Sequence, residues 1–248
     1  MTGEPLLIEE ADDRVVLRLN RPEVRNAIDQ QTVDALHAAC ALLEERPRVA
    51  LIVGSSGVFA AGADIGQLRE RRREDALRGI NSGVFDRVRR LPMPTIALID
   101  GYALGGGAEL AYACDFRIGT PTTRIGNPET GLGILAAAGA AWRLAELVGE
   151  PVAKEILLVG RILDADEAHA LRLLNEVVES DELEAAGQRL AERIAQQGPL
   201  AVRLTKTVFH APREAHPVID DLAQAVLFET EDKERRMTAF LERNKEKR

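Results

Sequence analysis

The feature that most constrains the fold is an apolar run followed by a glycine-rich turn and a helix. Thr95–Ile99 is a short, largely apolar segment of the kind that forms a buried strand, and residues 108–113 have the composition of a helix start. Between them lie Gly101 and the triplet Gly105 to Gly107. Glycines admit backbone conformations closed to other residues and leave no side chain over the turn. The order predicts a strand–turn–helix unit in which a ligand can lie against backbone amides.

The same turn combines an anion site with an acid or base. Unpaired N–H groups at a helix N-terminus and the helix dipole both favour negative charge, and Glu109 lies just inside this turn. Two nucleotide-binding motifs do not fit this turn. The dinucleotide fingerprint Gly-x-Gly-x-x-Gly, counted from Gly105, would need its third glycine at position 110, which is Leu110. The phosphate-binding loop ends in Gly-Lys-Ser/Thr, and the chain contains no such sequence. The turn alone leaves open an alternative: a tight turn packed under a helix, with Glu109 serving only the helix cap.

Composition describes an ordinary globular protein. The chain has 248 residues, of which 46% are hydrophobic and 29% charged, enough for one full-sized core with or without a helical appendage. The net charge of -8 argues against a nucleic-acid partner. No apolar run reaches the length of a bilayer, and the first ten residues lack a signal pattern. We therefore expect a cytoplasmic protein with no membrane partner.

Cysteine and histidine spacing predicts no metal site. Cys40 and Cys114 are isolated in apolar helical contexts, where a buried free thiol is more common than a disulfide or a metal ligand. The four histidines show no ligand spacing, and we expect His210 and His216 at the surface or in turns. No serine lies in a Gly-x-Ser-x-Gly motif, which argues against a serine hydrolase.

Strands and helices alternate before the chain becomes helical. Arg14–Leu19 and Val49–Val53 are predicted strands, and a helix is predicted from Asp29, its cap, to Glu45. Beyond Ala136 we expect one short strand at 176–178. The helices expected there are 140–148, 152–159, 165–174, 181–197, 200–210, 218–230 and 233–243. This order predicts an α/β core over residues 1–190 and a helical region over residues 191–248.

Several segments together resemble the crotonase, or enoyl-CoA hydratase/isomerase, superfamily. They are Arg21-Pro22 with Asn26-Ala27, residues 59–65, residues 101–110, Asp115, residues 127–133, Phe228-x-Thr230-x-Asp232 and residues 239–241. The resemblance covers nearly the whole chain, and the combination is more specific than any one segment. It implies an α/β spiral of strand-strand-helix turns. It also implies a C-terminal helical region that packs between subunits, commonly as trimers paired into hexamers.

The resemblance further implies an acyl-CoA thioester ligand and no other cofactor. By position, the backbone amides of Ala63 and Gly106 would form an oxyanion hole around the thioester oxygen. Glu109 and Glu129 would be the catalytic carboxylates, with Glu129 supplying and removing the C2 proton while Glu109 activates the water. The other contacts it implies are Val24, Arg25, Ala61, Asp64, Ile65, Gly66, Gly105, Pro128, Leu132 and, on a neighbour's CoA, Phe240 and Arg243.

The leading prediction is an enoyl-CoA hydratase, a hydro-lyase of fatty-acid or related acyl-CoA metabolism. It would add water to a 2-enoyl-CoA thioester to give a 3-hydroxyacyl-CoA. Two alternatives stay open: an isomerase that moves the double bond with Glu129 alone, and a non-catalytic module that binds acyl-CoA or protein. The presence of both Glu109 and Glu129 favours the hydratase.

Two further segments bear on the ligand. The basic cluster Arg69 to Arg73 is interpreted either as a solvated helix face or as an anchor for ligand phosphates. After Gly133, alanines stand where relatives usually have a proline and several glycines before a Gly-Thr-Gln-Arg-Leu-like sequence. The added methyl groups affect substrate length more than reaction type. We expect Trp142 to be a core or interface aromatic rather than a substrate contact.

Overall fold

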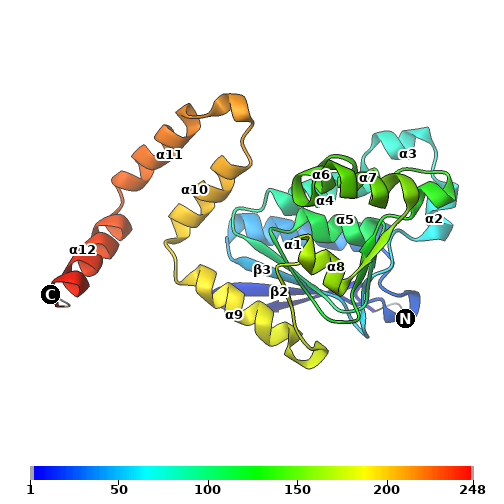
Figure 1. Cartoon of the computed structure of the whole chain (residues 1–248), viewed down its shortest axis with the longest axis horizontal. Helices are drawn as coiled ribbons and strands as arrows, with labels where there is room; N and C mark the ends of the chain where they lie inside the picture. Colours follow the sequence, from blue (N-terminus) through cyan, green and yellow to red (C-terminus); the bar gives the residue numbers. More distant parts are fainter. Residues whose placement is uncertain (1–2, 247–248) are drawn as a thin grey trace.

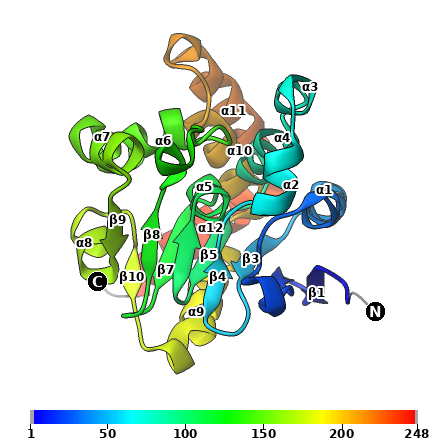
Figure 2. The ribbon, with the colours of Figure 1, turned by 90° about the vertical axis from the view of Figure 1, so that its right-hand side faces the viewer.

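Two β-sheets form the centre of the molecule (Figure 2). The computed structural model describes residues 3–246, and the side chains of residues 3–243. The larger sheet has the strand order β1-β2-β3-β5-β7-β10, and the smaller has the order β4-β6-β8-β9. The strand bounds are β1 (Leu6–Glu10), β2 (Arg14–Leu19), β3 (Val49–Val53), β4 (Val58–Ala60), β5 (Thr95–Ile99), β6 (Tyr102–Leu104), β7 (Phe116–Gly119), β8 (Arg124–Gly126), β9 (Ile162–Asp164) and β10 (Glu176–Val177).

Each turn of the chain adds one strand to each sheet. β3 is followed by β4, β5 by β6 and β7 by β8. Helices return the chain to the larger sheet after β4 and β6, whereas after β8 the chain first adds β9 to the smaller sheet and then β10 to the larger one. From β2 to β10 the larger sheet is parallel, as are β4, β6 and β8 in the smaller one. This arrangement is a spiral of strand-strand-helix turns, so the predicted α/β class is confirmed.

Strands β1, β4, β6 and β9 were not predicted, and each is short or lies at a sheet edge. β1 pairs antiparallel with β2, and β9 pairs antiparallel with β8. β6 interrupts the glycine-rich segment that was expected to lead directly from β5 into a helix. Because β6 pairs with β4 and β8, it anchors the turn from both sides. The amides after Leu104 are therefore held by a sheet.

The helices cover the sheets and then continue beyond them (Figure 1). Asp29 caps the first helix as predicted, accepting a hydrogen bond from the Thr32 amide at 2.9 Å. The helix bounds are α1 (Gln30–Glu45), α2 (Ile65–Glu70), α3 (Arg73–Leu77), α4 (Ile80–Arg89), α5 (Gly106–Ala113), α6 (Ala140–Val148), α7 (Glu150–Val159), α8 (Ala165–Ala170), α9 (Leu183–Ala195), α10 (Pro199–Phe209), α11 (Val218–Phe228) and α12 (Glu231–Glu246).

Helix α8 is shorter than the predicted 165–174. Arg172 adopts a positive φ of 62°, which a continuing α-helix does not accommodate. The chain turns there so that Leu173 and Leu174 enter the core, both fully buried, with their amides donating to the Ala168 carbonyl. Burial of these two leucines ends the helix early.

Both faces of the larger sheet are buried, which explains its continuous apolar strands. Alternate residues of β3 and β5 pack on opposite sides: Ile52 and Ala97 face one cluster with α1 and α5, whereas Leu51 and Leu98 face the other. Helix α9 covers that second face. A Cβ on its Gly187 would lie only 2.8 Å from the Leu98 side chain, so the helix packs closely on the sheet. The core's buried cysteines, Cys40 and Cys114, are free thiols as predicted.

Helices α11 and α12 extend away from the two sheets (Figure 1). They leave large apolar side chains exposed: Val218, Leu222, Val226, Phe228, Met237, Phe240 and Leu241. The predicted division at residue 190 falls inside α9, which packs on the core; the division itself stays a prediction. No helix within residues 3–246 is long and apolar enough to cross a membrane.

Candidate active site

Two loops bring a pair of backbone amides together at the start of α5. A Cβ built on Gly106 would lie 3.5 Å from the Ala63 nitrogen. Backbone bonds to Ile28 from both sides of Ala63 hold this loop: the Ile28 amide donates to the Gly62 carbonyl at 2.8 Å, and the Asp64 amide donates to the Ile28 carbonyl at 3.3 Å. Across residues 3–246, neither the Ala63 amide nor the Gly106 amide donates a hydrogen bond. Both stay available to an acceptor on a ligand.

Close packing of α5 on β4 sets this geometry. A Cβ on Gly107 would lie 2.2 Å from the Ala60 carbonyl oxygen, so only glycine lets the helix approach the strand this closely. The approach places the N-terminus of α5 beside the loop that follows β4. The glycine triplet predicted as a ligand-binding turn thus first serves as a packing surface, and the packing aligns the amides.

Glu109 is a buried carboxylate on the first turn of α5. Its side chain is only 4% exposed, and its Oε1 accepts hydrogen bonds from the amides of Ala138 at 2.7 Å and Ala140 at 3.1 Å. Burial raises the pKa of Glu109 to about 7; the negative charge of Glu129 acts in the same direction, while the two amides oppose it. Near neutral pH this group therefore either accepts or donates a proton.

Glu129 begins a short 3-10 helix, Glu129–Leu132, after β8. The side-chain amide of Asn127 donates to its Oε1 at 3.3 Å, and its buried Oε2 has no hydrogen-bond partner in the described chain. Burial raises the pKa of Glu129 above its ordinary value, against the hydrogen bonds from its own backbone and from Asn127. The carboxylate lies over Gly105, directly before the Gly106 amide.

Two buried polar groups at this site were missed in the sequence. On α4, the Asn81 Nδ2 is buried without an acceptor in the described chain and lies 3.8 Å from the Cβ position of Gly106. Its Oδ1 accepts from Arg71 at 3.0 Å, which turns the NH₂ group toward the amides. The fully buried Tyr112 hydroxyl also has no partner among those residues. No local motif marks either residue, because only the fold brings them to the site.

The remaining ligand-lining residues of the prediction form two loops. Val24 and Arg25 lie beside Ala61, whose amide donates to the Arg25 carbonyl at 3.0 Å. Asp64 caps α2 by accepting from the Gln67 amide at 2.9 Å. Ile65 and Gly66 are exposed in the segment beside Ala63. In the segment beside Glu129, Leu132 is exposed and Pro128 is partly exposed.

Phe240 and Arg243 lie away from this group of residues. Both are exposed on α12, which projects from the far end of the helical extension (Figure 1). Within one chain they do not contribute to the site. The side chains of the basic cluster, Arg69 to Arg73, point in different directions. Arg69 and Arg73 are exposed and pair with adjacent glutamates, whereas Arg71 donates a hydrogen bond to Asn81.

A cavity of about 330 Å³ opens beside Glu109. Trp142 is 47% exposed and lines this cavity together with Tyr112, so the expected core position is wrong, whereas the expected interface position stays a prediction. The structure brings it there because α6 packs against α5. A ligand chain that continues past Glu109 would enter this space.

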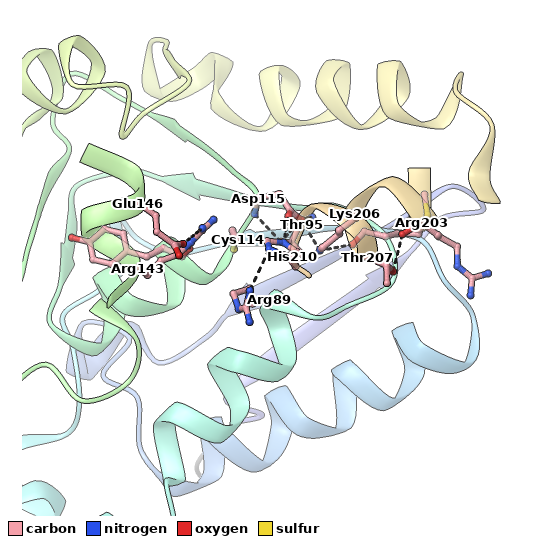
Figure 3. Close-up of polar contacts among 12 residues, drawn as sticks. Arg89, Thr95, Cys114, Asp115, Arg143, Glu146, Arg203, Lys206, Thr207 and His210 are labelled. Carbon is pink, nitrogen blue, oxygen red and sulfur yellow. Dashed lines mark hydrogen bonds and ion pairs between the residues drawn. The ribbon is translucent and has the colours of Figure 1, made fainter. Parts of the chain in front are cut away.

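His210 lies in the turn that ends α10, one of the two positions expected for it, but its side chain is not at the surface. The side chain is 14% exposed, and its Nε2 lies 3.7 Å from Asp115 Oδ1. Its Nδ1 lies 3.2 Å from Arg89 (Figure 3). The cluster ties α10 to the core and takes His210 out of solvent. Among the side chains that the structure describes, no group of three or more His, Cys, Asp or Glu residues gathers as metal ligands would.

The sequence and the fold of this chain were compared with those of known proteins. The enoyl-CoA hydratase/isomerase family profile matches residues 11–247. The chain belongs to the enoyl-CoA hydratase/isomerase family. It is 37% identical to crotonyl-CoA hydratase of Syntrophomonas wolfei, with 99% of this chain and 98% of that protein covered. Short-chain-enoyl-CoA hydratase of Clostridium acetobutylicum is 35% identical, with 97% of this chain and 95% of that protein covered.

Solved structures of the enoyl-CoA hydratase/isomerase family have the same fold. The enoyl-CoA hydratase of Bacillus anthracis superposes with a TM-score of 0.91 at 32% identity, covering 96% of each chain. An enoyl-CoA hydratase from Mycobacterium smegmatis also gives a TM-score of 0.91, at 27% identity and 97% coverage of each chain. The family resemblance predicted from the sequence is thereby confirmed.

Proposed function

We propose that this protein is an enoyl-CoA hydratase, which adds water to a 2-enoyl-CoA thioester and forms a 3-hydroxyacyl-CoA. One observation carries the proposal: the buried carboxylate of Glu109 and the partly buried carboxylate of Glu129, both with raised pKa values, accompany two backbone amides that have no acceptor in the described chain. Hydration of an enoyl thioester needs such an acid–base pair and a site for negative charge on the thioester oxygen.

The amides of Ala63 and Gly106 are the oxyanion hole in this proposal. When water attacks C3, the electrons of the C2=C3 double bond move toward the thioester oxygen. The two N–H groups stabilise the charge that forms there, and loss of one such donor typically costs about 3 to 4 kcal/mol of barrier. Neither amide has to break a protein hydrogen bond to do so.

The two carboxylates move the protons. Ionised Glu109 takes a proton from water as the oxygen bonds to C3, and protonated Glu129 gives its proton to C2. The pair holds one proton before and after the step, and exchange with solvent returns the proton from Glu109 to Glu129. Groups positioned in this way typically contribute about 100- to 10,000-fold to the rate. The pKa of Glu109, about 7, suits a base that works near neutral pH.

Three further features belong to the proposal. Val24, Arg25 and the loop from Ala61 to Gly66 line the CoA side of the site, with Gly105, Pro128 and Leu132. The exposed apolar residues of α11 and α12 support a homo-oligomer, a trimer or a hexamer, in which Phe240 and Arg243 reach a neighbour's CoA. The protein works in the cytoplasm and needs no cofactor beyond the CoA of its substrate.

A panel of purified 2-enoyl-CoAs of different chain length tests the proposed activity. Hydration removes the conjugated absorbance and adds the mass of one water to the product. Incubation of a 3-enoyl-CoA in heavy water separates isomerisation, which gives a conjugated product without a hydroxyl group. Conversion of the 3-enoyl substrate alone would replace the hydratase with the isomerase, and no conversion of either class would overturn both.

A further inference from the structure

The cavity beyond Glu109 has a polar and positively charged wall. It is lined on the α4 side by Ser82, Asp86, Arg89 and Arg90, and on the α6 side by Trp142 and Arg143. The apolar part of the lining is Phe85, Ala113, Ala137 and Ala138, against which an acyl chain can pack. In the polar part, three guanidinium groups lie with the carboxylates of Asp86 and Glu109, and Asp86 pairs with two of them, Arg89 and Arg90. An alkyl end group set against these charges would displace water from them, which costs free energy. An anionic end group suits this part of the wall.

Arg89 is held in a fixed orientation at this wall. Its side chain is only 16% exposed, it bonds to Asp86 through Nε and Nη2 at 3.3 and 3.2 Å, and its guanidinium lies 5.1 Å from the centre of the Trp142 ring. Its Nη1 contacts His210 at 3.2 Å (Figure 3). A guanidinium has five N–H groups, so these contacts leave donors on Nη1 and Nη2 without an acceptor in the described chain.

Arg143 lies on α6, and its guanidinium also has N–H donors without an acceptor in the described chain. Its side chain is 11% exposed, with Nη1 on Glu146 at 2.7 Å and Nε on the Tyr112 carbonyl at 3.4 Å. Nη2 makes no hydrogen bond to any residue that the structure describes. Arg89 and Arg143 are thus both mostly buried, both oriented by other contacts, and both able to donate to a further acceptor. Orientation before binding reduces the entropy that a ligand must overcome.

We propose that the preferred substrate is a 2-enoyl-CoA whose acyl chain ends in a carboxylate, which Arg89 and Arg143 bind at the end of the cavity opposite the thioester. This inference rests on the proposed function and names its substrate class. A carboxylate is planar, and a guanidinium matches it with parallel N–H donors. The Trp142 ring lies against Arg89 and restricts its guanidinium from one side.

Competition between matched substrates tests the assignment. The probes are 2-enoyl-CoAs of five to eight carbons, each prepared with a terminal methyl and with a terminal carboxylate. We expect kcat/KM to favour the carboxylate of at least one chain length by about 10- to 100-fold, the range for a hydrogen bond to a charged group. A ratio at or below one at every length, or a larger preference for an aromatic acyl chain, overturns the proposal.

Variants connect the preference to Arg89. We expect Arg89→Gln to lower the ratio of carboxylate to methyl substrate about tenfold or more, and Arg89→Lys to retain part of it, because lysine keeps the charge without the planar fork. The matched control is Arg189→Gln, which removes an exposed arginine that pairs with Glu182 outside the cavity. Because both substrates are measured on the same preparation, the ratio is insensitive to the fraction folded. An unchanged ratio in Arg89→Gln contradicts the proposal.

Binding without turnover separates this inference from the hydratase proposal. Calorimetry on the wild-type protein compares saturated acyl-CoAs with and without a terminal carboxylate. If the carboxylated form binds more tightly and Arg89→Gln loses this difference, the cavity assignment is supported, even where no enoyl-CoA is hydrated. Absence of hydration would overturn only the hydratase proposal. Hydration of crotonyl-CoA with no carboxylate preference in binding or turnover would overturn only the inference drawn from the cavity.

Discussion

The carboxylate of Glu129 lies directly over Gly105, where any other residue would place a side chain. A Cβ built on Gly105 would be 3.0 Å from Glu129 Oε1 and 3.4 Å from its Cδ. Gly105 also has a positive φ of 53°. One glycine therefore meets two requirements, since it supplies the backbone turn before the Gly106 amide and leaves room for an acid–base group beside that amide.

Replacement of Gly105 by alanine is expected to displace Glu129 and reduce turnover. The added methyl group forces the carboxylate to move by a few tenths of an ångström, and the positive φ adds strain of about 1 kcal/mol. A misplaced catalytic group can cost on the order of 100-fold in rate. The matched control is Gly131→Ala, where a Cβ meets no atom within 4 Å. Equal loss of hydration in both variants would contradict the specific role of Gly105.

Glu109→Gln should change how stability depends on pH. The folded-state pKa of Glu109 is raised from 4.5 to about 7, so the stability associated with its protonated form is present below pH 4.5 and lost as pH rises to about 7. Glutamine keeps an oxygen for the amides of Ala138 and Ala140 but does not ionise. We expect the variant to gain on the order of 3 kcal/mol over wild type between pH 5 and pH 8.5.

Urea unfolding at these two pH values measures that difference. The matched control is Glu176→Gln, which replaces an exposed carboxylate on β10. If the stability of Glu109→Gln relative to wild type is the same at both pH values, then burial does not destabilise the ionised form of Glu109. That result would contradict the assignment of Glu109 as a base near neutral pH.

Asn81→Ala is expected to lower kcat more than it raises KM. The Asn81 NH₂ group is buried without an acceptor in the described chain and faces the region of the Ala63 and Gly106 amides. A donor that gains its partner only as charge develops stabilises the transition state more than the bound substrate. Its loss should reduce kcat roughly 10- to 100-fold. Steady-state kinetics distinguish this from a rise in KM alone, which would indicate a role in binding only.

Asn81→Asp sharpens the test of the same group. The substitution preserves size but places negative charge near the developing oxyanion, so it should be more harmful than alanine. Asn20→Asp is a control at an exposed amide that donates to the Glu4 carbonyl. A variant Asn81→Asp as active as Asn81→Ala would mean that the NH₂ group does not face the reacting oxygen.

The ion pair between Lys206 and Asp115 should hold α10 on the core. Their atoms lie 2.7 Å apart, and both side chains are largely buried (Figure 3). Although burial alone would raise the pKa of Asp115, contacts with His210 and Lys206 outweigh it and lower the pKa. Lys206→Met leaves a buried carboxylate unpaired, so we expect a loss of about 3 to 5 kcal/mol in the free energy of unfolding.

The Lys206 prediction has an internal check. Lys206→Met combined with Asp115→Asn removes both charges and should recover part of the loss, because no unpaired charge remains. Lys154→Met breaks an exposed pair with Glu150 and should change stability by less than about 1 kcal/mol. A double variant no more stable than Lys206→Met would indicate that the lysine acts through packing and not through its charge.

Much of the central sheet could be predicted, because its strands are buried on both faces and therefore continuously apolar. Val49–Val53 and Thr95–Ile99 are such strands, and both were placed correctly. β6 and β9 have three residues each and lie among glycines or charged residues, so their pairing partners decide their conformation more than their own sequence does. The helix boundary at Arg172 likewise depends on burial of the leucines that follow it.

The candidate site could be predicted only where its residues lie within motifs. Gly106, Glu109 and Glu129 stand in glycine-rich segments that follow strands, and their local sequence indicates their chemistry. Asn81 and Arg89 lie on an ordinary amphipathic helix, and the spiral fold alone brings them to the site. Trp142 was expected in a core or an interface, since no pattern within α6 shows that its ring borders a cavity beside α5.

The most direct test of the account follows crotonyl-CoA with the wild-type protein and Glu129→Gln, alongside Glu176→Gln as the matched control. We expect wild type and the control to consume the conjugated absorbance and yield a product heavier by one water. The rate with Glu129→Gln should fall by roughly 100-fold or more, because the proton donor to C2 is lost. Hydration by Glu129→Gln at the wild-type rate would contradict the account.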